Sequence, residues 1–170
     1  MNDKLLFSKL RSVKSPVRAH ETDAGIDFFL PDEFTNDDIQ HSFEVTGSHI
    51  FIDGRGNINI PSHAAVLLPS GLKVIVPKGY ALIFFNKSGV ATKKHLLRGA
   101  CVADCGFQGE ILFNFVNTSN TNVELSPGEK IIQGVLIQVG SHQPVEVDDI
   151  MNYTNQSERG EGGFGSSGTN

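Results

Sequence analysis

The C-terminal stretch 155–170 is rich in glycine and serine, yet it carries side chains suited to binding a phosphate and a base. Arg159 can make a forked contact to a phosphate, Ser166 and Ser167 supply hydroxyls, and the glycines let backbone amides approach an anion. The ring of Phe164 can cover a base. A bare glycine-serine tail is usually a flexible linker. With these side chains, the stretch predicts a lid that becomes ordered over a bound nucleotide.

The elements that must hold such a lid and its ligand are predominantly strands. The 170 residues fit one domain, and 39% hydrophobic against 19% charged residues suffice for a core. The 18 glycines and 7 prolines separate short runs rich in Val, Ile and Phe, without a long segment of helical period. This predicts an all-β sandwich or barrel with minimal helix, formed by residues 1–154, followed by the lid at 155–170. The clearest strands are expected at 65–68, 72–76, 80–85, 111–116 and 131–137.

Two further segments carry residue patterns that predict a hairpin and a helical turn. Residues 31–58 are polar and are expected to form an extended surface excursion containing a hairpin that turns at 53–56, Asp-Gly-Arg-Gly. Residues 148–153 are expected to make the one helical turn, capped by Asp148 or Asp149.

The charge pattern narrows the class of partner. The net charge is −5 and the 14 Lys and Arg residues do not cluster, which argues against a nucleic acid or an anionic membrane and leaves a free nucleotide. No apolar run approaches the roughly 18–20 residues of a membrane span. The opening Met-Asn-Asp-Lys does not resemble a signal peptide. A cytoplasmic location is therefore expected, in the host cytoplasm if the source is viral.

Cysteine and histidine give no sign of a metal site in the sequence. Cys101 and Cys105 have no second Cys/His pair at zinc spacing, fit a reducing compartment and are interpreted as packing residues. The 6 histidines include no i, i+4 pair, so they are expected on the surface.

Four further segments, taken with the tail, resemble in order the five motifs of the trimeric deoxyuridine triphosphate nucleotidohydrolases, the dUTPases. These segments are 23–27 (Asp-Ala-Gly-Ile-Asp), 86–91 (Asn-Lys-Ser-Gly-Val-Ala), 99–110 and 128–133 (Gly-Glu-Lys-Ile-Ile-Gln). The resemblance implies a jelly-roll-like β fold and a homotrimer whose three sites combine motifs of different subunits. It also implies hydrolysis of dUTP to dUMP and pyrophosphate, which limits dUTP and supplies dUMP for dTTP synthesis.

The resemblance assigns the chemistry to Asp104. In the family this aspartate holds the attacking water and acts as general base toward the α-phosphorus, and here it is expected at the edge of a hairpin formed by the strands on either side of it. A carboxylate can take a proton from water at neutral pH while phosphate-bound Mg²⁺ offsets the charge repulsion, so Mg²⁺ is the expected cofactor. Asp27 matches the aspartate that lies near the phosphates and the waters around the metal.

The triphosphate is assigned by the same resemblance to seven residues: Lys87, Ser88, Gly89, Gln133, Arg159, Ser166 and Ser167. The family normally has Pro-Arg before this serine. Here Asn86 and Lys87 replace that pair, so a point charge takes the place of a forked guanidinium contact. From the residues alone, 87–89 also fits a plain surface turn, and Gln133 also fits an edge position of its strand.

The base and sugar are assigned to Gly99, Cys101, Val102, Phe107 and Phe164. Phe107 stands where the family has a tyrosine whose ring lies under the deoxyribose and leaves no room for a 2′-hydroxyl. The ring face is kept, so discrimination against ribonucleotides is expected. Cys101 replaces a common glycine near the base, and its volume leaves the accepted pyrimidine open.

Three alternatives stand beside dUTP hydrolysis. The deoxycytidine triphosphate deaminases have a similar third motif but need a glutamate ten positions after the aspartate, where this chain has Asn114. A hydrolase of a related deoxypyrimidine triphosphate also fits the residues. A non-catalytic nucleotide-sensing or protein-binding module, exposing residues 31–58, comes from another class, and the presence of Asp104 argues against it.

Overall fold

The computed structural model describes residues 4–153 of the chain. Two units, residues 1–140 and 141–170, are described separately. In the first unit the strands are β1 (Leu6–Lys9), β2 (Ile26–Phe29), β3 (Phe51–Ile52), β4 (Ile58–Ile60), β5 (Ala65–Pro69), β6 (Leu72–Ile75), β7 (Tyr80–Asn86), β8 (Leu96–Arg98), β9 (Val102–Asp104), β10 (Leu112–Asn117), β11 (Val123–Leu125) and β12 (Lys130–Gln138). The helices of this unit are α1 (Asn36–Thr46) and α2 (Ser88–Lys94).

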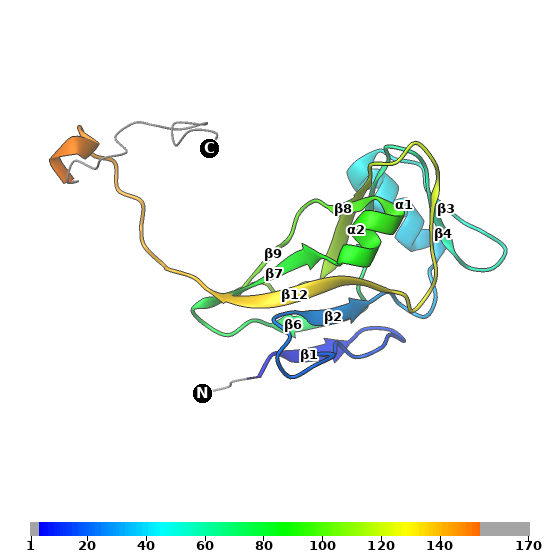
Figure 1. The fold of residues 1–170 in the computed structure, drawn as a ribbon, viewed down its shortest axis with the longest axis horizontal. Helices are drawn as coiled ribbons and strands as arrows, with labels where there is room; N and C mark the ends of the chain where they lie inside the picture. Colours follow the sequence, from blue (N-terminus) through cyan, green and yellow to red (C-terminus); the bar gives the residue numbers. More distant parts are fainter. Residues whose placement is uncertain (1–3, 154–170) are drawn as a thin grey trace, which may run out of the picture. The chain divides into compact units, whose positions relative to one another are not determined.

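These strands form four antiparallel sheets in the first unit. The largest has the order β2-β12-β7-β9, and Figure 1 shows β12 running between β2 and β7. The others have the orders β5-β10-β8, β11-β4-β3 and β1-β6. The described strands do not close into a barrel. The predicted all-β fold with little helix is confirmed, and its form is a sandwich of the jelly-roll type.

Three phenylalanine rings join the two main sheets in the core. Phe28 of β2 and Phe84 of β7 belong to the largest sheet, and Phe113 comes from β10 of the facing sheet. Their ring centroids lie 5.2 to 6.3 Å apart in edge-to-face geometry, the arrangement that aromatic quadrupoles favour. Gly134 of β12 makes room for them, because a Cβ there would lie 2.9 Å from a ring atom of Phe28.

All five strands expected from the apolar runs are present, as β5, β6, β7, β10 and β12. The turns between them also follow the sequence signals. Three turns have a glycine one or two residues after a proline, at Gly71, Gly79 and Gly128. Their φ values are +70°, +85° and +69°, which residues other than glycine rarely adopt. Local turn chemistry therefore sets where these strands end.

Helix α1 is the main departure from the predicted fold, because it occupies the polar excursion 31–58. Thr35 caps it, with its hydroxyl accepting the Asp38 amide at 3.3 Å and the Asp38 carboxylate accepting the Thr35 amide at 2.9 Å. Gly47 ends the helix in the left-handed conformation. The expected hairpin is confirmed, since β3 and β4 pair on either side of residues 53–57. No helix among residues 4–153 is both long and apolar enough to cross a membrane.

Side chains fix α1 to the rest of the first unit. The Arg11 guanidinium donates to both carboxylate oxygens of Asp38, at 2.7 and 2.9 Å. The buried Ser42 hydroxyl accepts the Leu67 amide at 3.1 Å. The Ser48 hydroxyl, just beyond the helix, accepts the Ala65 amide at 3.2 Å.

The second unit is described as far as residue 153. It contains a short 3-10 helix at Ile150–Tyr153, and the carboxylate of Asp149 accepts the Met151 amide at 2.9 Å. The predicted helical turn and its cap are therefore confirmed. Residues 154–170, and with them the predicted lid and the boundary at 154, lie outside the described part and stay predictions.

Replacing Asp38 tests how α1 is anchored. Burial raises the pKa of Asp38, but hydrogen bonds from Arg11 and Thr35 and the Arg11 charge outweigh it, so the pKa lies below its ordinary value. We expect Asp38→Ala to lower the free energy of unfolding by about 1–3 kcal/mol in urea titrations at pH 7. The control Asp37→Ala removes an exposed carboxylate of the same helical turn and should cost less than about 0.5 kcal/mol.

The contribution of Asp38 to the free energy of unfolding should depend on pH. Because the folded-state pKa of Asp38 is depressed, its contribution is complete above the unfolded value of about 4 and is lost as the pH falls through the folded value. The gap between wild type and Asp38→Ala should therefore narrow in acid. An equal gap at all pH values would contradict the ion pair.

Candidate active site

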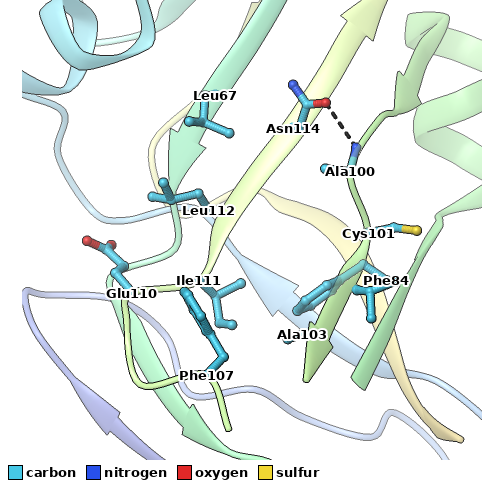
Figure 2. Close-up of a pocket in the computed structure, with 11 residues that line it drawn as sticks. Leu67, Phe84, Ala100, Cys101, Ala103, Phe107, Glu110, Ile111, Leu112 and Asn114 are labelled. Atoms are coloured by element: carbon cyan, nitrogen blue, oxygen red, sulfur yellow. Dashed lines mark hydrogen bonds between the residues drawn. The ribbon is translucent and has the colours of Figure 1, made fainter. Parts of the chain in front are cut away.

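A cavity of about 210 Å³ in the first unit is lined by residues of both main sheets and of the segment that joins them, as Figure 2 shows. Most of its wall is apolar, and it is lined by Leu67, Phe84, Ala100, Cys101, Val102, Ala103, Phe107, Glu110, Ile111, Leu112 and Asn114. Three of the predicted base and sugar residues, Cys101, Val102 and Phe107, therefore share one cavity. Gly99 is adjacent to it in the chain.

Asn114 accepts hydrogen bonds from the segment Gly99–Ala100, which lies at the cavity. Its side-chain oxygen accepts the Ala100 amide at 3.0 Å, and its backbone oxygen accepts the Gly99 amide at 2.8 Å. A Cβ on Gly99 would lie 1.8 Å from the Asn114 Oδ1, so only glycine fits there. The sequence motifs do not predict Asn114 as a site residue. The available signal was an amide within the otherwise apolar run 111–116.

Strand β9 presents an open backbone edge beside the cavity. Among residues 4–153 it is the last strand of its sheet, and its one partner there is β7, through Ala81–Asp104, Leu82–Ala103 and Ile83–Val102. The Phe84 amide donates to the Cys101 oxygen at 2.8 Å. Because hydrogen-bonded and non-bonded pairs alternate in antiparallel sheets, the N–H and C=O of Val102 point away from β7.

The expected hairpin around Asp104 is wrong. β9 belongs to the sheet of β7, whereas the following strand β10 pairs with β5 and β8 in the facing sheet. Residues 105–111 cross between the sheets, which is why the cavity has walls from both.

Asp104 is the exposed last residue of β9. Its backbone oxygen accepts the Phe107 amide at 3.1 Å in the turn that follows. Its carboxylate makes no hydrogen bond or ion pair with any residue in the described range 4–153. The Phe107 ring is 47% exposed, and a Cβ on Gly109 would lie 2.7 Å from it. Both side chains are thus open to a ligand, and Phe107 is not a core residue.

A second cluster surrounds the buried Asp27, at the opposite end of β7. One carboxylate oxygen of Asp27 pairs with the Lys87 ammonium, and the other pairs with that of Lys130 at 2.7 Å. Burial raises the pKa of Asp27, but the hydrogen bonds and charges of the two lysines outweigh it and hold the pKa below its ordinary value. Lys130 was not predicted as a site residue, although it lies within the fourth motif.

The other predicted phosphate residues lie beside this cluster. Gln133 pairs with Asp27 across the sheet and donates to the Asn86 oxygen at 3.0 Å. It lies in β12, between two strands, so the edge position is excluded. Ser88 and Gly89 are the exposed first residues of α2, which follows β7 directly. The structure therefore brings Lys87, Ser88, Gly89 and Gln133 together with Asp27.

The two clusters are far apart within one chain. Asp104 pairs with Ala81 near the start of β7, whereas Lys87 follows its end. Six residues of strand separate these positions by about 20 Å. A single chain therefore does not bring Asp104 to its predicted phosphate partners.

Metal ligands are sparse in the part that the structure describes. It contains no group of three His, Cys, Asp or Glu residues able to hold a metal ion. All six histidines are exposed, as expected. Cys101 packs partly against the core, but Cys105 is exposed, so the packing interpretation is wrong for Cys105. The predicted tail contacts Arg159, Phe164, Ser166 and Ser167 lie outside the described residues.

The chain is similar in sequence to known proteins. A deoxyuridine 5′-triphosphate nucleotidohydrolase of Gamma-proteobacterium EBAC31A08 is 35% identical over 95 residues, 54% of this chain, and the chain spans just under two thirds, 65%, of that relative's length. The enzyme of the same name from Candida albicans is 35% identical over 111 residues, 65% of this chain and 69% of its own.

The fold has a solved counterpart. The dUTPase of Staphylococcus bacteriophage 80alpha, solved with dUPNHPP, superposes with a TM-score of 0.76 at 22% identity, covering 99% of this chain and 100% of that chain. The family model of the dUTPases matches residues 52–168, which include β7, the cavity and Asp104. Because this match covers more than half of the chain, the chain belongs to the dUTPase family.

Proposed function

We propose that this protein hydrolyses dUTP to dUMP and pyrophosphate. The observation that carries the proposal is the open backbone edge of Val102 beside an apolar cavity, with Asp104 two residues further along the same strand. A base bound at that edge would have its sugar and α-phosphate near the carboxylate. Family membership supports the same substrate.

The cavity suits a pyrimidine such as uracil. Uracil offers an N–H flanked by carbonyl oxygens, and the Val102 N–H and C=O offer the complementary donor and acceptor. The apolar wall, including Cys101, suits the faces of the ring. The half-exposed ring of Phe107 is available to pack under the deoxyribose, which would exclude a 2′-hydroxyl.

Asp104 would act as the general base. As the oxygen of a water forms a bond to the α-phosphorus, the Asp104 carboxylate takes its proton. The bond from that phosphorus to the oxygen bridging to the β-phosphate breaks, and pyrophosphate leaves with the electron pair. The carboxylate is free for this role because no residue in the range 4–153 pairs with it.

The phosphates would bind at the Asp27 cluster. Lys87 and Lys130 exceed the charge of Asp27 by one, so the cluster attracts an anion, and Ser88, Gly89 and Gln133 add polar groups beside it. The tail residues Arg159, Phe164, Ser166 and Ser167 are proposed to complete the site as a lid.

Divalent-metal dependence is general in the dUTPase family, and we propose Mg²⁺ as the metal here. It would offset the charge of the triphosphate when bound. Since the described residues form no metal cage, the phosphates would supply most of its ligands, with Asp27 acting through water.

A homotrimer would complete the site. About 20 Å separates the backbone of Asp104 from that of Lys87 in one chain, so in the proposed trimer the Asp104 of one copy would work with the Lys87 of another. We propose that the three copies form three such sites, without nucleic acid or membrane partners, in the cytoplasm.

The role of Asp104 is tested with Asp104→Asn. The amide keeps the shape of the carboxylate but cannot take the proton, so pyrophosphate release from dUTP and Mg²⁺ should fall about 10²–10⁴-fold at unchanged dUTP affinity. Asp37→Asn, on exposed α1, is the control and should keep wild-type rates. A variant with half the activity would show that another group is the base. Ammonia release by the wild type would instead indicate a deaminase, and release of neither product a binding module.

The role of Lys87 is tested with Lys87→Gln. Loss of a charge-assisted contact should raise the KM for dUTP by about ten- to a hundredfold and weaken dUMP binding much less, because dUMP lacks the outer phosphates. The control Lys93→Gln removes an exposed lysine of the same helix. Equal effects of the two substitutions on KM would contradict a specific phosphate contact.

The shared site is tested by mixing. Light scattering should give about three times 18.4 kDa for the wild type. Asp104→Asn and Lys87→Gln copies should each be defective alone, but co-refolded at equal amounts they should regain activity at about a quarter of the sites, those with both native residues. Mixtures no more active than the single variants would place both residues in one chain's site.

A further inference from the structure

Asn114 lines the cavity, and both ends of its side chain form hydrogen bonds with the backbone. Figure 2 shows its carboxamide directed at Ala100, whose amide donates to Oδ1 at 3.0 Å. Its Nδ2 donates to the Val66 oxygen of β5 at 3.1 Å. Because both polar ends contact the backbone, these bonds fix the orientation of the carboxamide. It joins the Gly99–Ala100 segment to β5.

The peptide group that Asn114 contacts on β5 is also held from the other side. The Val66 C=O and the Leu67 N–H belong to one peptide unit, and that N–H donates to the buried Ser42 hydroxyl of α1 at 3.1 Å. A continuous chain of hydrogen bonds therefore runs from Ser42 through this peptide and the Asn114 carboxamide to the Ala100 amide. Amide groups linked in this way polarise one another and hold their neighbours in place.

The last hydrogen bond of this series, at the Ala100 amide, lies directly before the open edge of β9 in the sequence. Ala100 is followed by Cys101, whose backbone oxygen accepts a hydrogen bond from the Phe84 amide of β7. Val102 comes next in the chain. The position of the Val102 edge is therefore set between two fixed points. Discrimination between bases by hydrogen bonds requires donors and acceptors held within about 0.5 Å.

We propose that Asn114 is a positioning residue for base selection, and that Ser42 of α1 supports it through the Val66–Leu67 peptide. This inference rests on the proposed function and concerns the same cavity. The excursion 31–58 would then contribute to selectivity for uracil over cytosine without touching the nucleotide.

The first test compares Asn114→Asp with Asn117→Asp. Asn114→Asp keeps an acceptor for Ala100 but turns a carboxylate oxygen toward the Val66 oxygen. The ratio of kcat/KM for dUTP to that for dCTP should fall about three- to tenfold. Asn117 lies on the same strand and donates to the backbone oxygens of Ile60, Pro61 and Thr121, away from the cavity. Its substitution should lower Tm but leave this ratio unchanged.

The second test compares the two serines whose hydroxyls accept amides from the outer edge of β5. Ser42→Ala should lower the same ratio in the same direction, whereas Ser48→Ala, which loses the equivalent bond to Ala65, should not. Folding of each variant is checked by Tm, and all ratios are measured below the lowest Tm. Ser42→Ala also keeps the inference testable if Asn114→Asp does not fold.

The outcomes separate the two proposals. If the wild type neither turns over dUTP nor binds a non-hydrolysable dUTP analogue by calorimetry, the proposed function fails and this inference fails with it. If the wild type is active and folded Asn114 or Ser42 variants keep the wild-type ratio, the inference alone is overturned. A lower ratio in both variants, with both controls unchanged, supports it.

Discussion

The edge-to-face packing of Phe28, Phe84 and Phe113 is the contact on which the rest of the structure depends, because its rings come from both main sheets. Successive side chains of a strand point to opposite faces. With Phe113 in the core, Leu112 and Asn114 are turned to the cavity. The aromatic cluster thus fixes the spacing of the sheets and the orientation of the cavity wall together.

The paired lysines around Asp27 show how a buried carboxylate is tolerated in this fold. A lone buried charge is costly, and removing one partner of a buried pair leaves the other uncompensated. Here Asp27 has a partner at each oxygen, so either lysine can turn to an incoming anion while the other still neutralises the carboxylate. The arrangement keeps a positive charge available without leaving a buried negative charge alone.

Much of the fold could be predicted from local signals, and the failures have physical causes. Apolar runs such as 131–137 and turn glycines such as Gly128 are properties of neighbouring residues. Helix α1 had readable caps in Thr35, Asp38 and Gly47, but its polar composition favoured a loop. Helix α2 is only seven residues long and has no side-chain cap, so no comparable signal was present.

The site also contains residues that could be predicted from the sequence and residues that could not. Asp104, Phe107 and Lys87 could be proposed because their motifs are short and continuous. The contacts of Lys130 with Asp27 and of Asn114 with Ala100 depend on strand register and on which sheet a strand joins. The prediction of a hairpin at Asp104 was wrong for the same reason. The residues 101–110 carry no signal that β10 pairs in the other sheet.

The serine contacts of the excursion also bear on how copies of the protein avoid associating wrongly. β5 is an outer strand of its sheet, and unpaired amides on such a strand are a template for adding a strand from another molecule. Here the Ala65 and Leu67 amides donate to the Ser48 and Ser42 hydroxyls instead. A shortened chain lacking residues 31–58 would expose those amides beside an apolar core. The polar excursion therefore occupies hydrogen-bonding groups of an outer strand that another molecule could otherwise pair with.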